Sequence, residues 1–239
     1  QFFRLTKMQS QQYSIRYEFL FPGGDKKEFE LVFDEYSMSL VNFRGKEKPE
    51  WTRLTHEQCS CCPLGQDDHP YCPVAVNIAE LVENFKDRVS TEECTVKCIT
   101  PARTCMKETR IQQGLYSILG IVMATSDCPV MDIYKPMARF HLPFSTTKET
   151  LFRSASIYLL QQYFEYKRGG HPDLEMKHLG GRLRMVQAVN TGIIARIKNL
   201  SIKDADANAV IILDSFTKIL EMDLDDSLSS LEYLFPPKR

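Results

Sequence analysis

The chain has 239 residues, of which 43% are apolar and 26% are charged, and its 30 basic residues nearly balance its 31 acidic ones. This composition is typical of a soluble globular protein and excludes a disordered chain. Without a basic excess, nucleic acid is not the expected partner. The longest apolar run, YSILGIVMA at residues 116–124, is too short to span a bilayer, so we expect no membrane span.

The first patterned segment predicts a β-hairpin. Residues 1–10 are interpreted as an extension or an expression remnant outside the fold. Apolar residues then alternate with polar ones from Tyr13 to Phe21 and again from Phe29 to Phe33, on either side of the turn sequence PGGDKKE. Such alternation indicates two strands that bury one face.

Two helices and a third strand are expected next. Apolar residues at helical spacing predict a helix over residues 74–89 that begins directly at Cys72. The alternating segment TVKCIT at residues 95–100 predicts the third strand, with Cys98 as a core residue. A second helix over residues 107–125 would deliver Cys128 at its exit.

From Thr146 onward the chain is predicted to be helical. Thr146 and Glu149 form a capping box, and the helix that follows stops at Gly169 and Gly170. Further helices are predicted over residues 183–197 and 210–220, with a short one in SLSSLEYLF near the end, at residues 227–235.

The basic residues of the stretch RLRMVQAVNTGIIARIK, which include Arg196, are interpreted as the solvated face of an amphipathic helix. We therefore expect an α+β protein, with a small antiparallel sheet and a cysteine-rich metal loop followed by a helical bundle. The expected division is an α+β region at residues 11–145 and a helical region at residues 146–239, although one composite domain fits nearly as well.

The stretch HEQCSCCPLGQDDHPYCPVAV, residues 56–76, contains four cysteines, two histidines and three prolines. Cys59 and Cys62 form a C-x-x-C pair, a spacing that lets two thiolates from one tight turn reach the same metal ion. Cys72 lies at the predicted start of a helix, where the free amides and the helix dipole favour the thiolate form. Three candidate ligands therefore share one loop.

A fourth ligand is indicated by the prolines. Cys62, Cys72 and Cys128 are each followed directly by proline, more often than chance placement would give. The same Cys-Pro step closes a ligand run in bacterial ferredoxins. We therefore predict a metal site formed by Cys59, Cys62, Cys72 and Cys128, with structural zinc favoured and an iron–sulfur cluster as the alternative.

Other residues are weaker candidates for a role at this metal site. His69 and Cys61 are alternative ligands, while His141 and Arg139 could donate to thiolate ligands or neutralise their charge. A cysteine-dependent enzyme with Cys128 as nucleophile and His141 as base is a distant alternative, because no oxyanion loop or third partner can be identified. No catalytic residue and no nucleotide cofactor are predicted.

The motifs C-x-x-CPL, CPVA, ATSxCP, PMARFHLPF and YLLxQYF resemble those of an uncharacterised bacterial protein family of unknown function. The similarity runs from YEFLFPGG to the terminal YLF. It implies the same four cysteines and the segment Pro136–Phe144, and Asp127 stands where glycine is more usual. The resemblance implies no reaction.

The remaining expectations concern place and partners. With eight cysteines in a chain of this length and no sign of export, we expect reduced thiols in a cytoplasm. The expected partner is a protein, and the sequence does not assign an oligomeric state.

Overall fold

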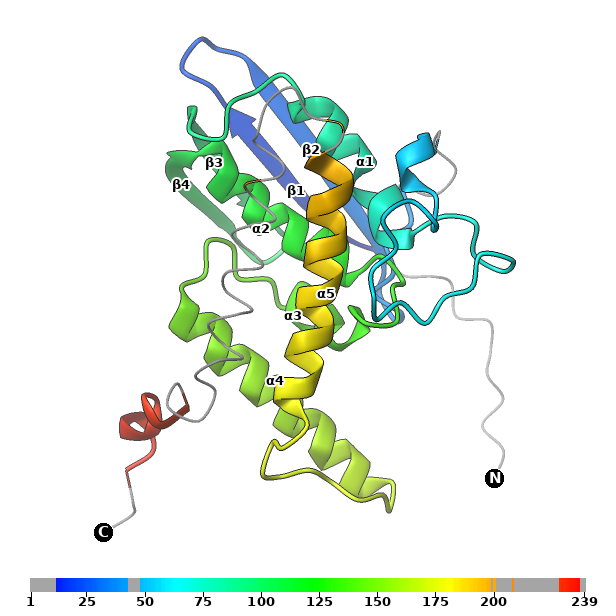
Figure 1. Cartoon of the computed structure of the whole chain (residues 1–239). Coiled ribbons are helices and arrows are strands. Elements are labelled where there is room, and N and C mark those ends of the chain that lie inside the picture. The colour runs from blue at the N-terminus through cyan, green and yellow to red at the C-terminus, as the bar shows by residue number, and fades with distance from the viewer. Residues whose placement is uncertain (1–11, 43–47, 199, 201–207, 209–227, 237–239) are drawn as a thin grey trace.

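The computed structural model describes residues 12–42, 48–198, 200, 208 and 228–236 (Figure 1). A four-stranded antiparallel sheet in the order β2-β1-β3-β4 is followed by a helical second half. The predicted α+β fold with a small N-terminal sheet is therefore confirmed.

The predicted hairpin forms from β1, Gln12–Leu20, and β2, Lys26–Asp34, with Tyr17 directly opposite Phe29. Gly24 has a φ of +84° in the connecting turn, a conformation that glycine adopts without steric cost. The apolar residues that alternate in the sequence lie on the buried face of the hairpin. The side chains of Ile15, Tyr17 and Phe19 are inaccessible to solvent.

The third predicted strand is β3, Glu93–Ile99, which pairs with β1. A fourth strand, β4 at Thr104–Arg110, was not predicted, and the helix expected from residue 107 is wrong over its first four residues. Because β4 lies at the sheet edge and is mostly exposed, its sequence TCMKETR lacks the apolar alternation that marks a half-buried strand.

Two helices cover one face of the sheet: α1, Pro73–Phe85, and α2, Ile111–Ala124 (Figure 1). Their contact with the sheet is close at Gly114, where an added Cβ would lie 2.5 Å from Cε1 of Phe19. As expected, α1 begins at the Cys72 N-cap with Pro73 in its first turn.

The helical half contains α3, Lys135–Arg139, α4, Thr147–Lys167, and α5, Leu179–Lys198. The predicted capping box at the start of α4 forms in both directions. In Figure 1, α5 runs beside α1, and its Val186, Ile193 and Ile197 belong to the same apolar cluster as the sheet.

Three short 3₁₀ helices complete the described elements: η1, Glu50–Thr52, η2, Asp132–Tyr134, and η3, Glu232–Leu234. The last lies in the predicted terminal helix, and the nearby Leu231 packs with Leu151 and Tyr158 of α4. The helix predicted over residues 210–220 lies outside the described residues. The division of the chain near residue 145 stays a prediction.

Within the ranges described, no helix is both long and apolar enough to cross a membrane.

Candidate metal centre

The cysteine loop, residues 55–71, is closed at its base by backbone pairing. Arg53 and Tyr71 form an antiparallel bridge, and the amide of Leu54 donates to the carbonyl oxygen of Pro70 at 2.9 Å. The amide of Cys72 donates to the carbonyl oxygen of Thr52 at 2.8 Å. The end of the loop, and with it Cys72, is thereby held against the segment that precedes the loop.

Within the loop, Cys59 and Cys62 occupy one tight turn, in which the Cys62 amide donates to the Cys59 carbonyl oxygen at 3.0 Å. This is the local geometry that the C-x-x-C spacing predicts. The turn packs on α5 at Gly192, where a Cβ would lie only 3.1 Å from the Cβ of Cys59. Glycine therefore allows the loop and the helix to approach each other closely.

Cys72 and Cys128 have matching backbone surroundings. Each is followed by Pro-Val and starts a helical turn, since the carbonyl of Cys72 accepts from the Val76 amide at 3.0 Å and that of Cys128 from the Met131 amide at 2.9 Å. Proline has no amide hydrogen, so the next two amides are the ones that reach the thiol. Burial raises the pKa of both thiols, and these amides oppose the rise: Val74 and Ala75 act on Cys72, and Val130 and Met131 act on Cys128.

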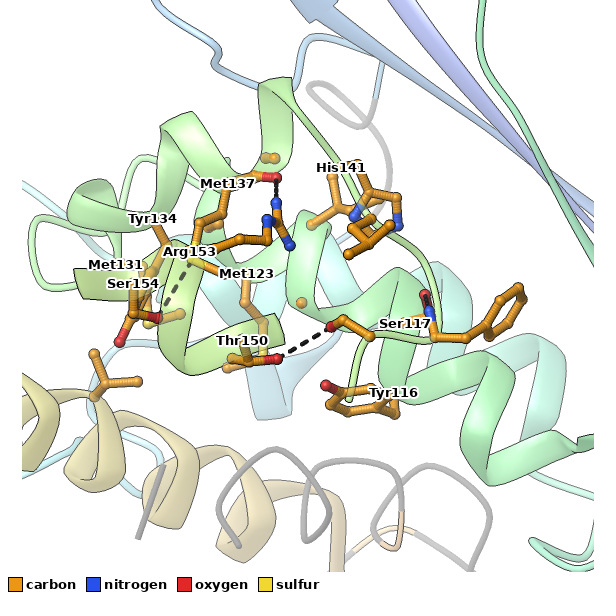
Figure 2. Close-up of a pocket in the computed structure, with 18 of the residues that line it drawn as sticks. Tyr116, Ser117, Met123, Met131, Tyr134, Met137, His141, Thr150, Arg153 and Ser154 are labelled. Carbon is orange, nitrogen blue, oxygen red and sulfur yellow. Dashed lines mark hydrogen bonds between the residues drawn. The ribbon is translucent and has the colours of Figure 1, made fainter. Parts of the chain in front are cut away.

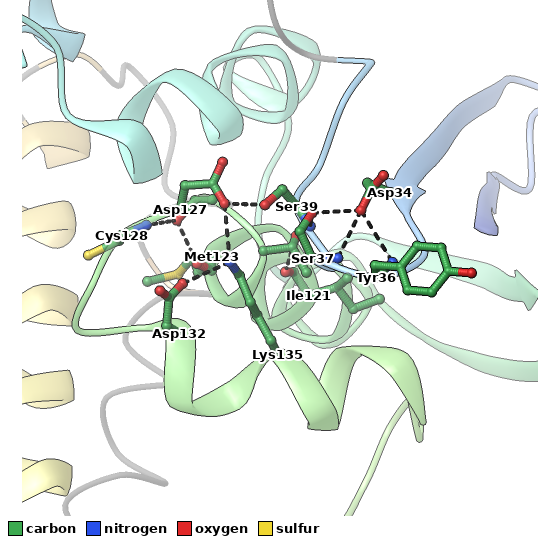
Figure 3. A network of polar contacts seen from close by, with 12 residues as sticks. Asp34, Tyr36, Ser37, Ser39, Ile121, Met123, Asp127, Cys128, Asp132 and Lys135 are labelled. Atoms are coloured by element: carbon green, nitrogen blue, oxygen red, sulfur yellow. Dashed lines mark hydrogen bonds and ion pairs between the residues drawn. The ribbon is translucent and has the colours of Figure 1, made fainter. Parts of the chain in front are cut away.

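The segment that carries Cys128 is anchored to the chain after β2 (Figure 3). Asp127 accepts hydrogen bonds from Ser39 and Lys135, and the amide of Leu40 donates to the carbonyl oxygen of Thr125 at 3.0 Å. Asp127 has a φ of +64°, in the left-handed region. That conformation gives a physical reason for a glycine at this position, and aspartate tolerates it better than most residues.

The four candidate cysteines are neighbours in the folded chain. Burial and, to a smaller extent, the neighbouring thiols of Cys62, Cys61, Cys72 and Cys128 together raise the pKa of Cys59 to about 12. Burial, with a contribution from Cys72 and Cys62 and against its two amides, likewise raises the pKa of Cys128 to about 11. The fold therefore brings Cys128 to the cysteine loop from a distant part of the sequence.

The arrangement is looser than a closed coordination shell. Among the described residues, no three histidine, cysteine, aspartate or glutamate side chains are grouped closely enough to hold a metal ion. The mutual effects of the cysteines on their pKa values are compatible with this looser arrangement. Charges influence one another across several ångströms, whereas zinc ligands lie about 2.3 Å from the ion. The assignment of these four thiols as ligands stays a prediction.

Arg196 is the residue of this region that the sequence analysis missed. The interpretation of Arg196 as part of a solvated face is wrong, since its side chain is 2% exposed. Its guanidinium donates to the carbonyl oxygens of Trp51, Arg53 and Leu54 at 2.8, 2.7 and 3.1 Å. Burial lowers the Arg196 pKa, while nearby Cys72, Cys59 and Cys62 act to raise it.

A signal for the position of Arg196 was present in the sequence. Arg196 lies four residues after Gly192 and three after Ile193, so all three share the buried face of α5. A buried cation therefore stands between the base of the cysteine loop and the thiols.

The alternative ligands, His69 and Cys61, differ in their contacts and exposure near the four cysteines. His69 is exposed on the cysteine loop. Cys61 belongs to the group electrostatically, but its thiol donates to the carbonyl oxygen of Met185 in α5 at 3.3 Å. His56, at the start of the loop, has a buried Nε2 with no hydrogen-bond partner in the described part of the chain. A bound cation would satisfy that nitrogen, which makes His56 a further candidate ligand.

His141 and Arg139 are engaged elsewhere. The Nε2 of His141 and the hydroxyl of Tyr17 are joined by a 2.6 Å hydrogen bond, and burial together with Arg153 lowers the His141 pKa to about 3. Arg139 pairs with Glu35 at 3.3 Å and its guanidinium lies 4.3 Å from the ring centre of Tyr13. The hydrogen bond of His141 to Tyr17 and the ion pair of Arg139 with Glu35 therefore join these residues to the sheet and its flanking loop.

The cysteines outside the quartet are placed mostly by the sheet. Cys98 is buried in β3, as expected, and lies directly opposite the half-buried Cys105 of β4. Cys94 is also buried in β3, and burial raises its pKa to about 11.

Comparison with known proteins adds a family but no activity. Residues 15–236 match the family model of a domain of unknown function, DUF6901. No curated protein and no solved structure matches the chain. The match spans most of the chain and agrees with the resemblance to an uncharacterised family. The chain therefore belongs to DUF6901, a family defined by a domain of unknown function.

Proposed function

We propose that this chain is a non-catalytic metal-binding protein in which Cys59, Cys62, Cys72 and Cys128 hold one zinc ion. The ion would fix the cysteine loop to the exit of α2. The observation that carries the proposal is the pair of matching Cys-Pro-Val turns, each of which starts at a cysteine, and in each of which two backbone amides oppose the rise in thiol pKa that burial causes. Such amides stabilise the thiolate form, which is the form that binds metal.

The charge balance supports the same assignment. Four thiolates around one Zn²⁺ leave roughly two negative charges, which a protein interior tolerates only when they are compensated. Arg196 offers a buried positive charge beside Cys59, Cys62 and Cys72. Its position is fixed by three backbone carbonyls, so the charge does not depend on the metal for its placement.

An iron–sulfur cluster is the alternative, because it uses the same four thiolates and its sulfur atoms also accept amide hydrogen bonds. Such a chain would serve in redox chemistry or sensing. A cysteine-dependent enzyme has less support, because His141 is engaged with Tyr17 and Pro129 provides no amide for an oxyanion beside Cys128.

The deciding experiment is elemental analysis with a visible spectrum on the full chain purified without oxygen. We expect near one zinc per chain and no colour in the wild type, and loss of the metal in the variants Cys72→Ser and Cys128→Ser. Cys105→Ser is the matched control, since Cys105 is half-buried and lies outside the quartet. The variant His56→Ala tests whether that ring takes part.

Wild-type metal content in both Cys72→Ser and Cys128→Ser would overturn the ligand assignment. Iron with matching sulfide and a visible charge-transfer band would replace zinc by the cluster while keeping the four ligands.

The helical half supplies the proposed partner surface. On α4 the large apolar side chains of Phe152, Leu160, Tyr163, Phe164 and Tyr166 are between 42% and 65% exposed. Exposed aromatic side chains are enriched where one protein binds another. We propose a protein partner for this surface and a cytoplasmic location, where the thiols would stay reduced until they bind metal.

A further inference from the structure

A partly open pocket of about 130 Å³ lies between α2, α3 and α4, apart from the cysteine loop (Figure 2). Most of its lining is apolar, and Met123, Met131 and Met137 contribute three flexible side chains. Methionine adapts its shape to irregular ligands. An apolar protein cavity of roughly 150 Å³ holds benzene, so this pocket accommodates a group of about that size.

Arg153 of α4 brings a positive charge into this apolar lining. Its Nη2 donates to the carbonyl oxygens of Met137 and Phe140 at 2.9 and 2.8 Å. Within the described residues, both of these bonds come from Nη2, its Nε and Nη1 donate to no acceptor, and no carboxylate lies within ion-pair distance of the guanidinium, although Glu149 is near enough to act on its pKa. The nearby Glu149 is occupied by its capping bonds to Thr146.

No carboxylate lines the pocket, so the charge of Arg153 is offset only in part, by Glu149 outside the lining and by Tyr116. His141 lines the pocket and is neutral at pH 7, because burial and Arg153 lower its pKa to about 3. The hydroxyl of Ser154 donates to the sulfur of Met137 at 3.7 Å. A half-buried guanidinium with unused donors therefore faces a mainly apolar space, and guanidinium matches the planar, two-oxygen geometry of a carboxylate.

We propose that this pocket binds a small monocarboxylate with a compact apolar body, whose carboxylate pairs with Arg153 and whose body packs on the three methionines. The pocket's size excludes a long acyl chain, and its single charge matches one carboxylate better than a phosphate dianion. The proposal concerns a second site and does not depend on metal binding at the cysteines.

The test is calorimetric titration of the full chain with benzoate, and with benzyl alcohol as the neutral analogue of nearly the same shape. We expect benzoate to bind with a Kd below about 1 mM. Benzyl alcohol should bind at least tenfold more weakly. The variant Arg153→Met should weaken benzoate binding roughly 10- to 100-fold, the usual effect of losing a charged hydrogen-bond partner.

Two further variants keep the test decisive. Arg168→Met is the matched control, because Arg168 is an exposed arginine at the opposite end of α4, paired with Glu165 at 3.0 Å and outside the pocket lining, so its loss should leave benzoate binding unchanged. Ala138→Leu fills the pocket from α3 without removing any bond of Arg153, and it should also abolish benzoate binding. If Arg153→Met fails to fold, the loss or survival of benzoate binding in Ala138→Leu still tests the proposed pocket.

No benzoate binding at millimolar concentration in the wild type, or equal binding of benzyl alcohol, would overturn the proposal. Benzoate binding that survives in the folded variant Ala138→Leu would likewise overturn it, because the carboxylate would then be bound elsewhere, for example at a metal.

Discussion

The substitution Arg196→Met removes a buried charge and the three hydrogen bonds that the charge makes. The acceptors are the carbonyl oxygens of Trp51, Arg53 and Leu54, at 2.7 to 3.1 Å from the guanidinium nitrogens. Hydrogen bonds to a charged group contribute about 1.5–3 kcal/mol each. Relief of the cost of burying a cation offsets part of that loss, and methionine keeps some of the stem packing. We expect a net loss of about 2–4 kcal/mol in the free energy of unfolding.

The variant Arg196→Lys should be intermediate in stability between the wild type and Arg196→Met. We expect it to lose about 1–2 kcal/mol in the free energy of unfolding, because lysine keeps the charge but not the planar fork that reaches three carbonyls. The assay is urea unfolding followed by circular dichroism, with a chelator present so that metal binding does not contribute. Lys198→Met, an exposed position on the same helix, serves as the control. If Arg196→Met unfolds within about 0.5 kcal/mol of that control, the guanidinium does not hold the base of the cysteine loop.

Two further predictions test the sheet and the helices that cover it. The His141 pKa is about 3 in the fold against 6.5 for the free side chain, so the unfolded chain binds more protons between these values and stability falls as the pH drops below 6.5. His141→Gln should therefore reduce the dependence of the unfolding free energy on pH by up to about 1.4 kcal/mol per unit near pH 5, and equal slopes in both proteins would contradict the buried neutral imidazole. Gly114→Ala should destabilise by about 1–3 kcal/mol because the new Cβ would lie 2.5 Å from Phe19. Gly180→Ala, with only Arg184 at 3.8 Å, should be neutral or stabilising in the same thermal unfolding assay, and similar effects of the two changes would contradict the close packing of α2 on the sheet.

The local features of the fold could be predicted because their signals are contained in short stretches. Alternation over residues 13–33 determined the hairpin, and the Thr146–Glu149 pair determined the start of α4. The C-x-x-C spacing determined the turn at Cys59 and Cys62 in the same way. Strand β4 could not be found, because an exposed edge strand has no buried face to impose a pattern.

The surroundings of the candidate site depended on contacts between distant segments. The Cys-Pro steps suggested that Cys128 joins the cysteine loop, and in the fold Cys72 and Cys62 lie near enough to act on its pKa. Helical spacing could have put Arg196 on the buried face of α5, but it could not show that this face meets the thiols. The pairing of Arg139 with Glu35 was equally hidden from sequence spacing.

The sequence by itself determined the secondary structure of the hairpin, α1, α4 and α5, and the single site that it predicts for the four cysteines stays a prediction. Only the tertiary structure decided which charged residues stand beside that site. The physical reason is that helix and turn formation depend on neighbours within a few residues, whereas the burial of a charge depends on which carbonyls the rest of the chain brings to it. For Arg196 those carbonyls come from the segment before the cysteine loop, at Trp51, Arg53 and Leu54.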